Sequence, residues 1–185
     1  MIILTDKDLE ILVNNSLSNR EEIYNKIHFK VSFEEFKQIL FSLKDDVEHI
    51  DLFSIIYWLL PHSMSKNEFE ELNTIFLKEK WHNGHDDMVG MFQVYFYDNP
   101  KNIDTILHIM NDLPEFYRYD TCLKHPFIRK CIYAIGAQPE PYNIQALEAL
   151  LEKETEEELI EYLEEQIETR KTDGRWEARR PRSDY

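Results

Sequence analysis

Apolar residues recur at intervals of three and four along most of this chain, and prolines or short polar turns separate the resulting runs. Alternation at intervals of two, which marks a β-strand, is rare. With 43% hydrophobic residues and only 4 glycines, the composition fits a folded protein with long helices and short turns. One run places five side chains on a single helical face: Phe33, Phe36, Ile39, Leu40 and Leu43. These patterns predict an all-α protein.

The spacing of the predicted helices indicates an internal repeat. First helices of successive pairs begin near Asp45, His85 and Pro126, at spacings of 40 and 41 residues. Helix pairs of this length are typical of a HEAT-like α-solenoid, in which antiparallel pairs stack side by side. Residue identity between the units is low, so an irregular helical bundle is the competing interpretation.

The length predicts one domain followed by a short tail. We expect residues 1–169 to form a single helical-repeat domain, with a divergent N-terminal cap at 1–44 and HEAT-like pairs at 45–169. Residues 170–185 carry six basic and three acidic side chains, which indicates a flexible basic tail.

Capping residues predict where several helices begin and end. Pro126 is placed to open a helix and Gly136 to stop it, and the final helix is expected to end at about Thr169. Three pairs have the spacing of a capping box: Ser32 and Glu35, Ser65 and Glu68, and Thr155 and Glu158.

The formal net charge of −15 restricts the classes of partner. It repels a phosphate backbone, which disfavours binding to nucleic acid. It favours a basic protein partner and fast, salt-dependent association with it. The competing interpretation is that the acidity only maintains solubility.

The chain has no run of apolar residues long enough to span a membrane, and its first residues do not resemble a signal peptide. Cys122 and Cys131 are nine residues apart, and two buried thiols in a reducing compartment are favoured over a disulfide. We therefore expect a cytoplasmic protein without a membrane partner. The oligomeric state is left open.

Motifs between residues 80 and 163 resemble those of a family of small bacterial HEAT-repeat proteins. The sequence departs from the family at Asp86, where the family prefers Glu. It also departs after Gly136, where the turn of the family is shorter than the turn in this sequence. The resemblance implies a HEAT-like solenoid and, for some members, a role as an immunity protein encoded beside a polymorphic toxin. It rests on these residues: Trp81-His82-Asn83-Gly84-His85-Asp86-Asp87, Pro100, Tyr119-Asp120, Arg129-Lys130-Cys131 and Ala134-Ile135-Gly136.

His82, His85 and Asp86 are candidate metal ligands, because two imidazoles and a carboxylate suit a divalent transition metal. Gly84 interrupts the pair of histidines, however, and Asp86 and Asp87 then occupy a first helical turn, where carboxylates favour the helix dipole. Structural capping is therefore the favoured interpretation of these residues over metal binding. Contact with a partner is a further interpretation.

Asp120 also has open interpretations. Asp120 could accept backbone amides at a helix start, or pair with Arg129 or a histidine across a repeat interface. No signature of a nucleophilic, phosphate-binding or metalloprotease site is present, so neither catalytic residues nor a cofactor is predicted.

We therefore expect a non-enzymatic protein-binding module, an immunity protein that neutralises a basic bacterial toxin domain. The alternatives are a metal-dependent enzyme using His82, His85 and Asp86, and a peptide-binding scaffold. Acidic residues and tyrosines are expected to form the partner-binding face: Asp86, Asp87, Tyr95, Tyr97, Tyr119 and Asp120.

Overall fold

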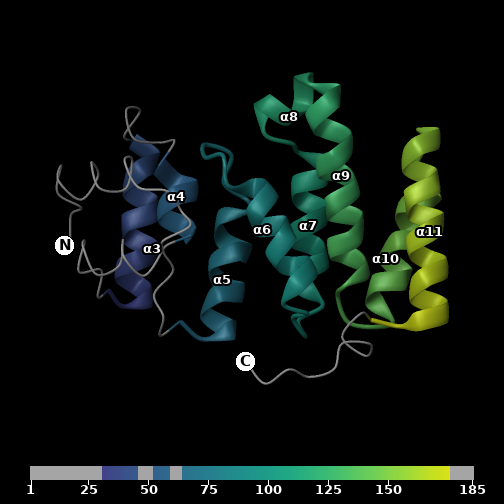
Figure 1. The fold of residues 1–185 in the computed structure, drawn as a ribbon, viewed down its shortest axis with the longest axis horizontal. Coiled ribbons are helices and arrows are strands. Elements are labelled where there is room, and N and C mark those ends of the chain that lie inside the picture. Colours follow the sequence, from purple (N-terminus) through teal and green to yellow (C-terminus); the bar gives the residue numbers. More distant parts are fainter. Residues whose placement is uncertain (1–30, 46–51, 59–63, 176–185) are drawn as a thin grey trace. The chain divides into compact units, whose positions relative to one another are not determined.

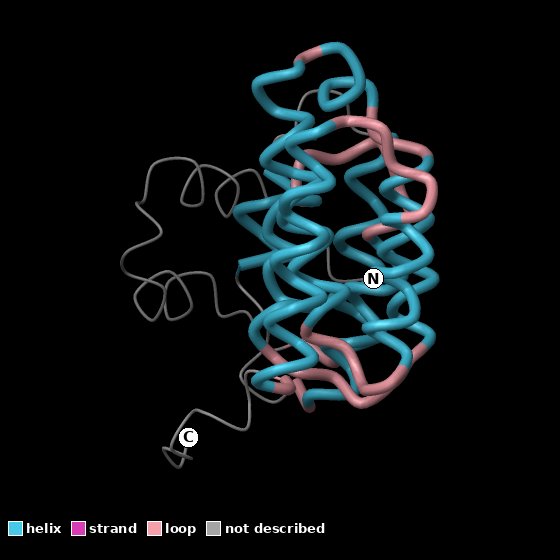
Figure 2. Tube along the Cα trace, turned by 90° about the vertical axis from the view of Figure 1, so that its right-hand side faces the viewer, coloured by secondary structure: helices cyan, strands magenta, loops and turns pink. Residues whose placement is uncertain are grey.

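A computed structural model describes residues 31–45, 52–58 and 64–175 (Figure 1). The described residues form helices and loops without a strand, as Figure 2 also shows, which confirms the predicted all-α class. Contacts divide the chain into two compact units, residues 1–72 with 81–84 and residues 73–80 with 85–185. The first thirty residues of the predicted N-terminal cap lie outside the described residues.

The N-terminal unit contains helix α3 (Phe33–Ser42), the 3-10 turn η2 (Leu43–Asp45), helix α4 (Leu52–Trp58) and the first part of helix α5 (Lys66–Phe76). Its apolar core includes Phe36 and Leu40 of α3, which packs against α4. Two predicted capping boxes form here. Ser32 and Glu35 exchange side-chain-to-backbone hydrogen bonds before α3, and Ser65 and Glu68 do the same before α5.

The C-terminal unit is built around α9 (Thr121–Gly136). This helix contacts each of the other helices from α6 onward. Its interior face is apolar and fully or almost fully buried, with Cys131, Ala134 and Ile135 among its residues. The five helices around it are α6 (His85–Val94), α7 (Lys101–Asn111), α8 (Glu115–Tyr119), α10 (Tyr142–Leu151) and α11 (Glu157–Asp173).

Helix α9 begins earlier than predicted. Asp120 is its N-cap, and the carboxylate accepts a hydrogen bond from the backbone N–H of Cys122 at 2.9 Å. Pro126 therefore lies inside the helix and does not open it. The prediction failed because proline at a first helical position is common, whereas this proline follows a helix start already fixed by an aspartate cap.

Gly136 is the last residue of α9, but it does not end the helix through a left-handed conformation, since the following cap residue Ala137 is right-handed. A Cβ atom at Gly136 would lie 3.1 Å from Oε1 of Gln166 and 3.7 Å from Cδ of Arg170, both on α11. The glycine therefore permits α9 and α11 to approach closely.

Helix α11 departs from its predicted bounds at both ends. Its N-cap is Glu156 and makes no side-chain capping bond, so the predicted capping box of Thr155 and Glu158 does not form. The helix continues to Asp173, and Arg175 is tied back to the unit by hydrogen bonds described below. The first six residues of the predicted tail are thus part of the fold, and residues 176–185 lie outside the described residues.

Within the described ranges, no helix combines the length and the apolar character that crossing a membrane requires.

Candidate functional site

His82 is a packed residue of the N-terminal unit. Its ring is buried and stacks on Phe53 with centroids 3.9 Å apart. Its Nδ1 accepts a hydrogen bond from the backbone N–H of Gly84 at 3.1 Å. A Cβ on Gly84 would come within 2.8 Å of the same phenylalanine ring, so the glycine is required by this packing. The imidazole helps to close the turn before α6.

His85 is the first residue of α6 and is fully buried. Its Nε2 lies 2.6 Å from the carbonyl oxygen of Glu79, so this nitrogen carries the proton and donates it. The ring also lies 6.2 Å from Phe116. The histidine joins the segment before α6 to the helix start.

Asp86 forms an ion pair with Lys130, which joins α6 to α9. Lys130 also donates to the backbone carbonyl of Asp86 at 3.4 Å. Of the two interpretations of Asp120, the structure has the cap at a helix start. Arg129 lies instead 5.3 Å from the ring of Tyr162 on α11. Asp86 thus positions two packed helices.

The three candidate metal ligands therefore have three separate structural contacts. Across the ranges that the structure describes, no group of three or more histidine, cysteine or carboxylate side chains is arranged to hold a metal ion. The geometry supports the capping and packing interpretation of His82, His85 and Asp86.

Tyr97 cannot belong to a partner-binding face, because its ring is fully buried. Asn73 donates to its hydroxyl at 3.4 Å, and Phe92 meets it edge to face. Tyr95 remains exposed and stacks over Tyr97 with centroids 6.0 Å apart. Of the two tyrosines, only Tyr95 is accessible to a partner.

The remaining residues of the predicted partner-binding face come from three parts of the C-terminal unit. Half-buried Asp86 and Asp87 begin α6, whereas Tyr95 follows its end, which separates them by about 12–14 Å at 1.5 Å per residue. Asp120 likewise lies about 15 Å along α9 from Lys130, the partner of Asp86. Tyr119 and Asp120 lie together where α8 meets α9, and the charges of Asp86 and Asp87 act on Tyr117 of the same α8, whose pKa they help to raise.

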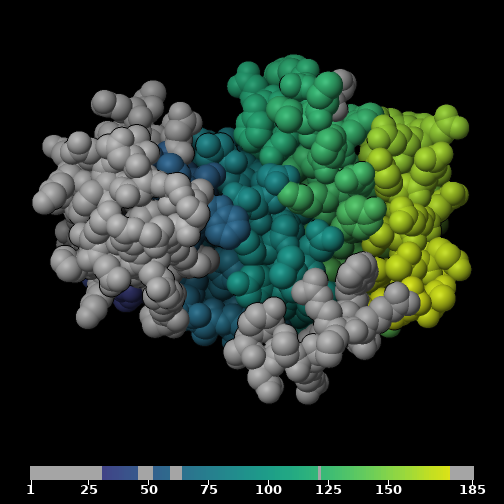
Figure 3. All heavy atoms as spheres, in the orientation of Figure 1, coloured from purple at the N-terminus to yellow at the C-terminus, as the bar shows by residue number. Residues whose placement is uncertain are grey.

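That junction exposes more apolar surface than was predicted. Tyr119 is 77% exposed, and Phe116 and Leu123 are 41% and 46% exposed. We call these three residues the α8–α9 corner. The segment that carries them, α8 and the start of α9, projects at the top of the C-terminal unit in Figure 3, in green. Phe116 and Leu123 were missed because α8 was not predicted. Phe116 lies three residues before Tyr119 and Leu123 four after it, but the extended cap residue Asp120 separates α8 from α9, so no single helical period relates them.

Basic side chains near the α8–α9 corner already have acidic or carbonyl partners. Arg118 donates to Asp112 at 3.2 Å and to the carbonyl of Leu113 at 2.9 Å, and Lys124 pairs with Glu156 at 3.0 Å. Asp120, at the centre of the junction, is exposed. The charged groups around these apolar side chains therefore have a net charge that is zero or negative.

A charged cluster joins the first turns of α9 and α11. Both ring nitrogens of His125 face carboxylates, Nε2 at 2.8 Å from Glu156 and Nδ1 at 3.0 Å from Glu158. The hydrogen bond from Lys124 is the main cause that lowers the pKa of Glu156, and the bond from Tyr162, followed by that from His125, lowers the pKa of Glu158. The contacts of Lys124 and His125 with Glu156 and Glu158 thus join α9 to α11.

Neither cysteine forms a disulfide. Cys131 is fully buried, and burial raises the pKa of its thiol far above the ordinary value, which suits a packed side chain and not a nucleophile. Cys122 is exposed, contrary to the expectation that both are buried.

The fold and these contacts define an all-α protein whose predicted site residues chiefly hold helices together. No family model, curated protein or solved structure matches the chain significantly.

Proposed function

We propose that this protein is a non-enzymatic protein-binding module whose α8–α9 corner docks a basic protein partner. The observation that carries the proposal is the exposure of three large apolar side chains, Phe116, Tyr119 and Leu123, within eight residues. Exposed tyrosine and phenylalanine are the side chains on which protein interfaces depend most, because they bury a large area with few rotamers to freeze.

Charge supports a basic partner. The whole chain carries −15, and Arg118 and Lys124 beside the corner are engaged with acidic groups. A cationic protein is steered toward such a surface over a distance of about 8–10 Å at physiological salt. Within this class, the resemblance to immunity proteins supports a basic bacterial toxin domain as the partner.

We also infer that the C-terminal unit is a HEAT-like solenoid of stacked helix pairs. Helices α6, α9 and α11 begin at His85, Thr121 and Glu157, so each start follows the previous one by 36 residues. Helix α9 packs against both α6 and α11, and α7 packs against α10. Contacts between helices one repeat apart are the pattern that a solenoid requires.

Substitution at the corner tests the docking proposal. Tagged wild-type protein, Tyr119→Ala and Tyr142→Ala are used to capture proteins from a lysate of the native organism at low and high salt, with identification by mass spectrometry. Tyr142 is a matched control, since it is 51% exposed but lies on α10. We expect the wild type and Tyr142→Ala to retain the same basic protein and Tyr119→Ala to lose it.

The captured protein is then purified and its affinity for all three proteins is measured by calorimetry. Loss of at least tenfold in affinity is expected for Tyr119→Ala alone, since central aromatic residues contribute about 2 kcal/mol or more. Equal affinity for the three proteins, or an acidic partner, contradicts the proposal.

A further inference from the structure

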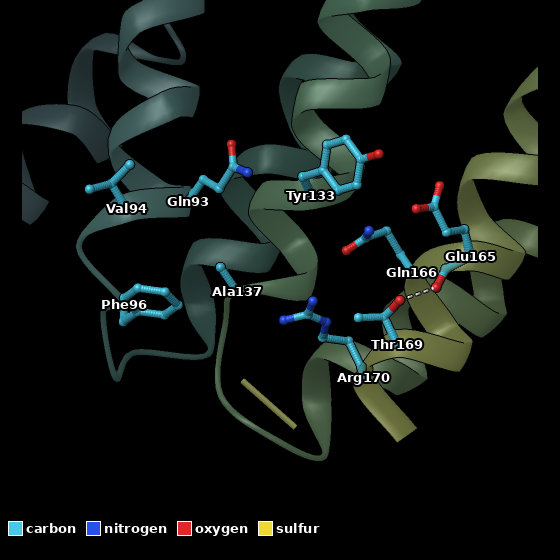
Figure 4. Close-up of a pocket in the computed structure, with 9 residues that line it drawn as sticks. All are labelled: Gln93, Val94, Phe96, Tyr133, Ala137, Glu165, Gln166, Thr169 and Arg170. Atoms are coloured by element: carbon cyan, nitrogen blue, oxygen red, sulfur yellow. Dashed lines mark hydrogen bonds between the residues drawn. The ribbon is translucent and has the colours of Figure 1, made fainter. Parts of the chain in front are cut away.

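A cavity of about 390 Å³ lies in the C-terminal unit, away from the α8–α9 corner. It is lined by the end of α6 and the loop after it, by the last turns of α9 and by α11 (Figure 4). Cavities of about 300–1,000 Å³ are the usual size for small-molecule sites. Nothing in the proposed protein interface uses this space.

One wall of the cavity is apolar and held in a strained conformation. Phe96 has a φ of +47°, a left-handed value that is rare for a phenylalanine, and its ring is buried. Arg175 holds this loop in place by donating to the carbonyl of Tyr97 at 3.0 Å and to Asp98 at 3.0 Å, and its guanidinium lies 5.9 Å from the Phe96 ring. Ala137 continues the wall. Strain of this kind persists only where surrounding contacts enforce it, and it concentrates at binding sites.

The facing wall is polar and cationic. Arg170 of α11 lines the cavity although it is only 3% exposed, and Figure 4 shows its guanidinium directed toward Ala137. Gln166, one turn earlier, is also buried, and Gly136 leaves room for both. Glu165 lines the cavity too, but it is exposed, so water screens its charge more than that of Arg170.

We propose that this cavity binds a small organic carboxylate with an apolar body. A planar guanidinium is suited to hold a carboxylate through two parallel hydrogen bonds, and the amide of Gln166 provides a further donor. The apolar part of the ligand packs on Phe96 and Ala137. The class is thus an aromatic or branched aliphatic acid of modest size.

Thermal unfolding with three matched probes tests the chemistry. Benzoate, benzamide and benzylamine share a ring and differ in charge, and each is titrated to millimolar concentration at constant ionic strength. We expect benzoate to raise the Tm saturably, benzamide to have a smaller effect and benzylamine none. An equal response to all three, or none to benzoate, overturns the proposal.

Three variants locate the site. Ala137→Leu fills the cavity from the apolar wall, Arg170→Gln removes the cation, and Glu168→Gln is a control on the exposed face of α11. Benzoate binding, measured by calorimetry, is expected to weaken at least tenfold in Ala137→Leu and Arg170→Gln and to persist in Glu168→Gln. Circular dichroism establishes that each variant is folded, and if Arg170→Gln unfolds, Ala137→Leu alone decides. Undiminished binding to a folded Ala137→Leu variant overturns the assignment to this cavity.

Discussion

Gly136 and Gly90 are both helical glycines, yet their surroundings differ. A Cβ at Gly90 of α6 would meet nothing within 4 Å, whereas a Cβ at Gly136 would press on the buried amide of Gln166. Gly90 lies inside α6, whereas Gly136 is the last residue of α9, so helix propensity favours alanine less at Gly136 and the approach of α11 opposes it there.

We expect Gly90→Ala to raise the free energy of unfolding by about 0.5–1 kcal/mol, because alanine loses less backbone entropy than glycine on folding. Gly136→Ala, at a helix end, gains a smaller contribution and must displace Gln166, so no net gain is expected. Urea unfolding followed by circular dichroism measures both. Equal stabilisation by the two substitutions would show that Gln166 of α11 moves aside without a cost in free energy.

Asp86 stabilises the fold through its ion pair with Lys130 and through its place in the first turn of α6. Asp86→Ala is expected to lower the free energy of unfolding by about 1 kcal/mol, since an exposed pair contributes about 0.2–1 kcal/mol and a first-turn carboxylate about 0.3–1 kcal/mol. Asp104→Ala, an exposed first-turn residue of α7, is the control for the second contribution. A double-mutant cycle with Lys130→Ala isolates the pair, and zero coupling energy contradicts its role.

At the scale of elements, the sequence predicted helix existence better than helix ends. The capping boxes at Ser32 and Ser65 were correctly identified because all their bonds are local. The third, at Thr155, failed because Glu158 bonds instead to Tyr162 and to His125, a residue on another helix. Tertiary contacts of this kind leave no mark in local spacing.

The same argument explains the candidate site. Sequence spacing identified His82, His85 and Asp86 as polar residues near a helix start. Structural capping was the favoured interpretation of them. It could not identify Phe53, the carbonyl of Glu79 or Lys130 as their partners, because two of these lie 29 or more residues away. The cavity at Phe96 was missed for a similar reason, since its walls come from three separate helices.

The cluster of His125, Glu156 and Glu158 predicts a pH dependence for the junction of α9 and α11. Both carboxyls have a folded pKa below their ordinary value of 4.5. Their contribution to stability is therefore complete above that value and is lost as the pH falls through the lowered pKa. We expect the free energy of unfolding to decrease from about pH 4.5 downward, and less steeply in Glu158→Gln. Glu161→Gln on the same helix is the control, and an identical slope for both variants contradicts the assignment.

At the scale of the whole molecule, composition predicts the sign of a partner's charge but not the place where it docks. The net charge of −15 is fixed by counting residues. The exposed corner around Tyr119 depends on α8, whose five residues are too few to show a helical period. Of the predicted face of six residues, Tyr97 is buried, whereas Tyr119 belongs to the exposed apolar group and Asp120 follows it.

Long-range steering makes a separate prediction for the association rate. For the proposed basic partner, we expect the association rate constant to fall by about tenfold or more between 50 and 500 mM salt, while the dissociation rate changes less. Stopped-flow or surface-based kinetics measures both. An association rate that does not respond to salt would contradict the electrostatic part of the proposal. Only the docking at the apolar side chains of the α8–α9 corner would then remain.

Helix α9 has one further consequence, for the way the C-terminal unit opens. Because α9 contacts α6, α7, α8, α10 and α11, it cannot separate from its surroundings without exposing a face of each. Its amide hydrogens should therefore exchange with deuterated solvent only through global unfolding, whereas α10 and α11, which pack on one another, can open as a pair. Slow exchange should thus be concentrated in one helix at the middle of the unit, and α10 and α11 should lose structure before the rest of the unit.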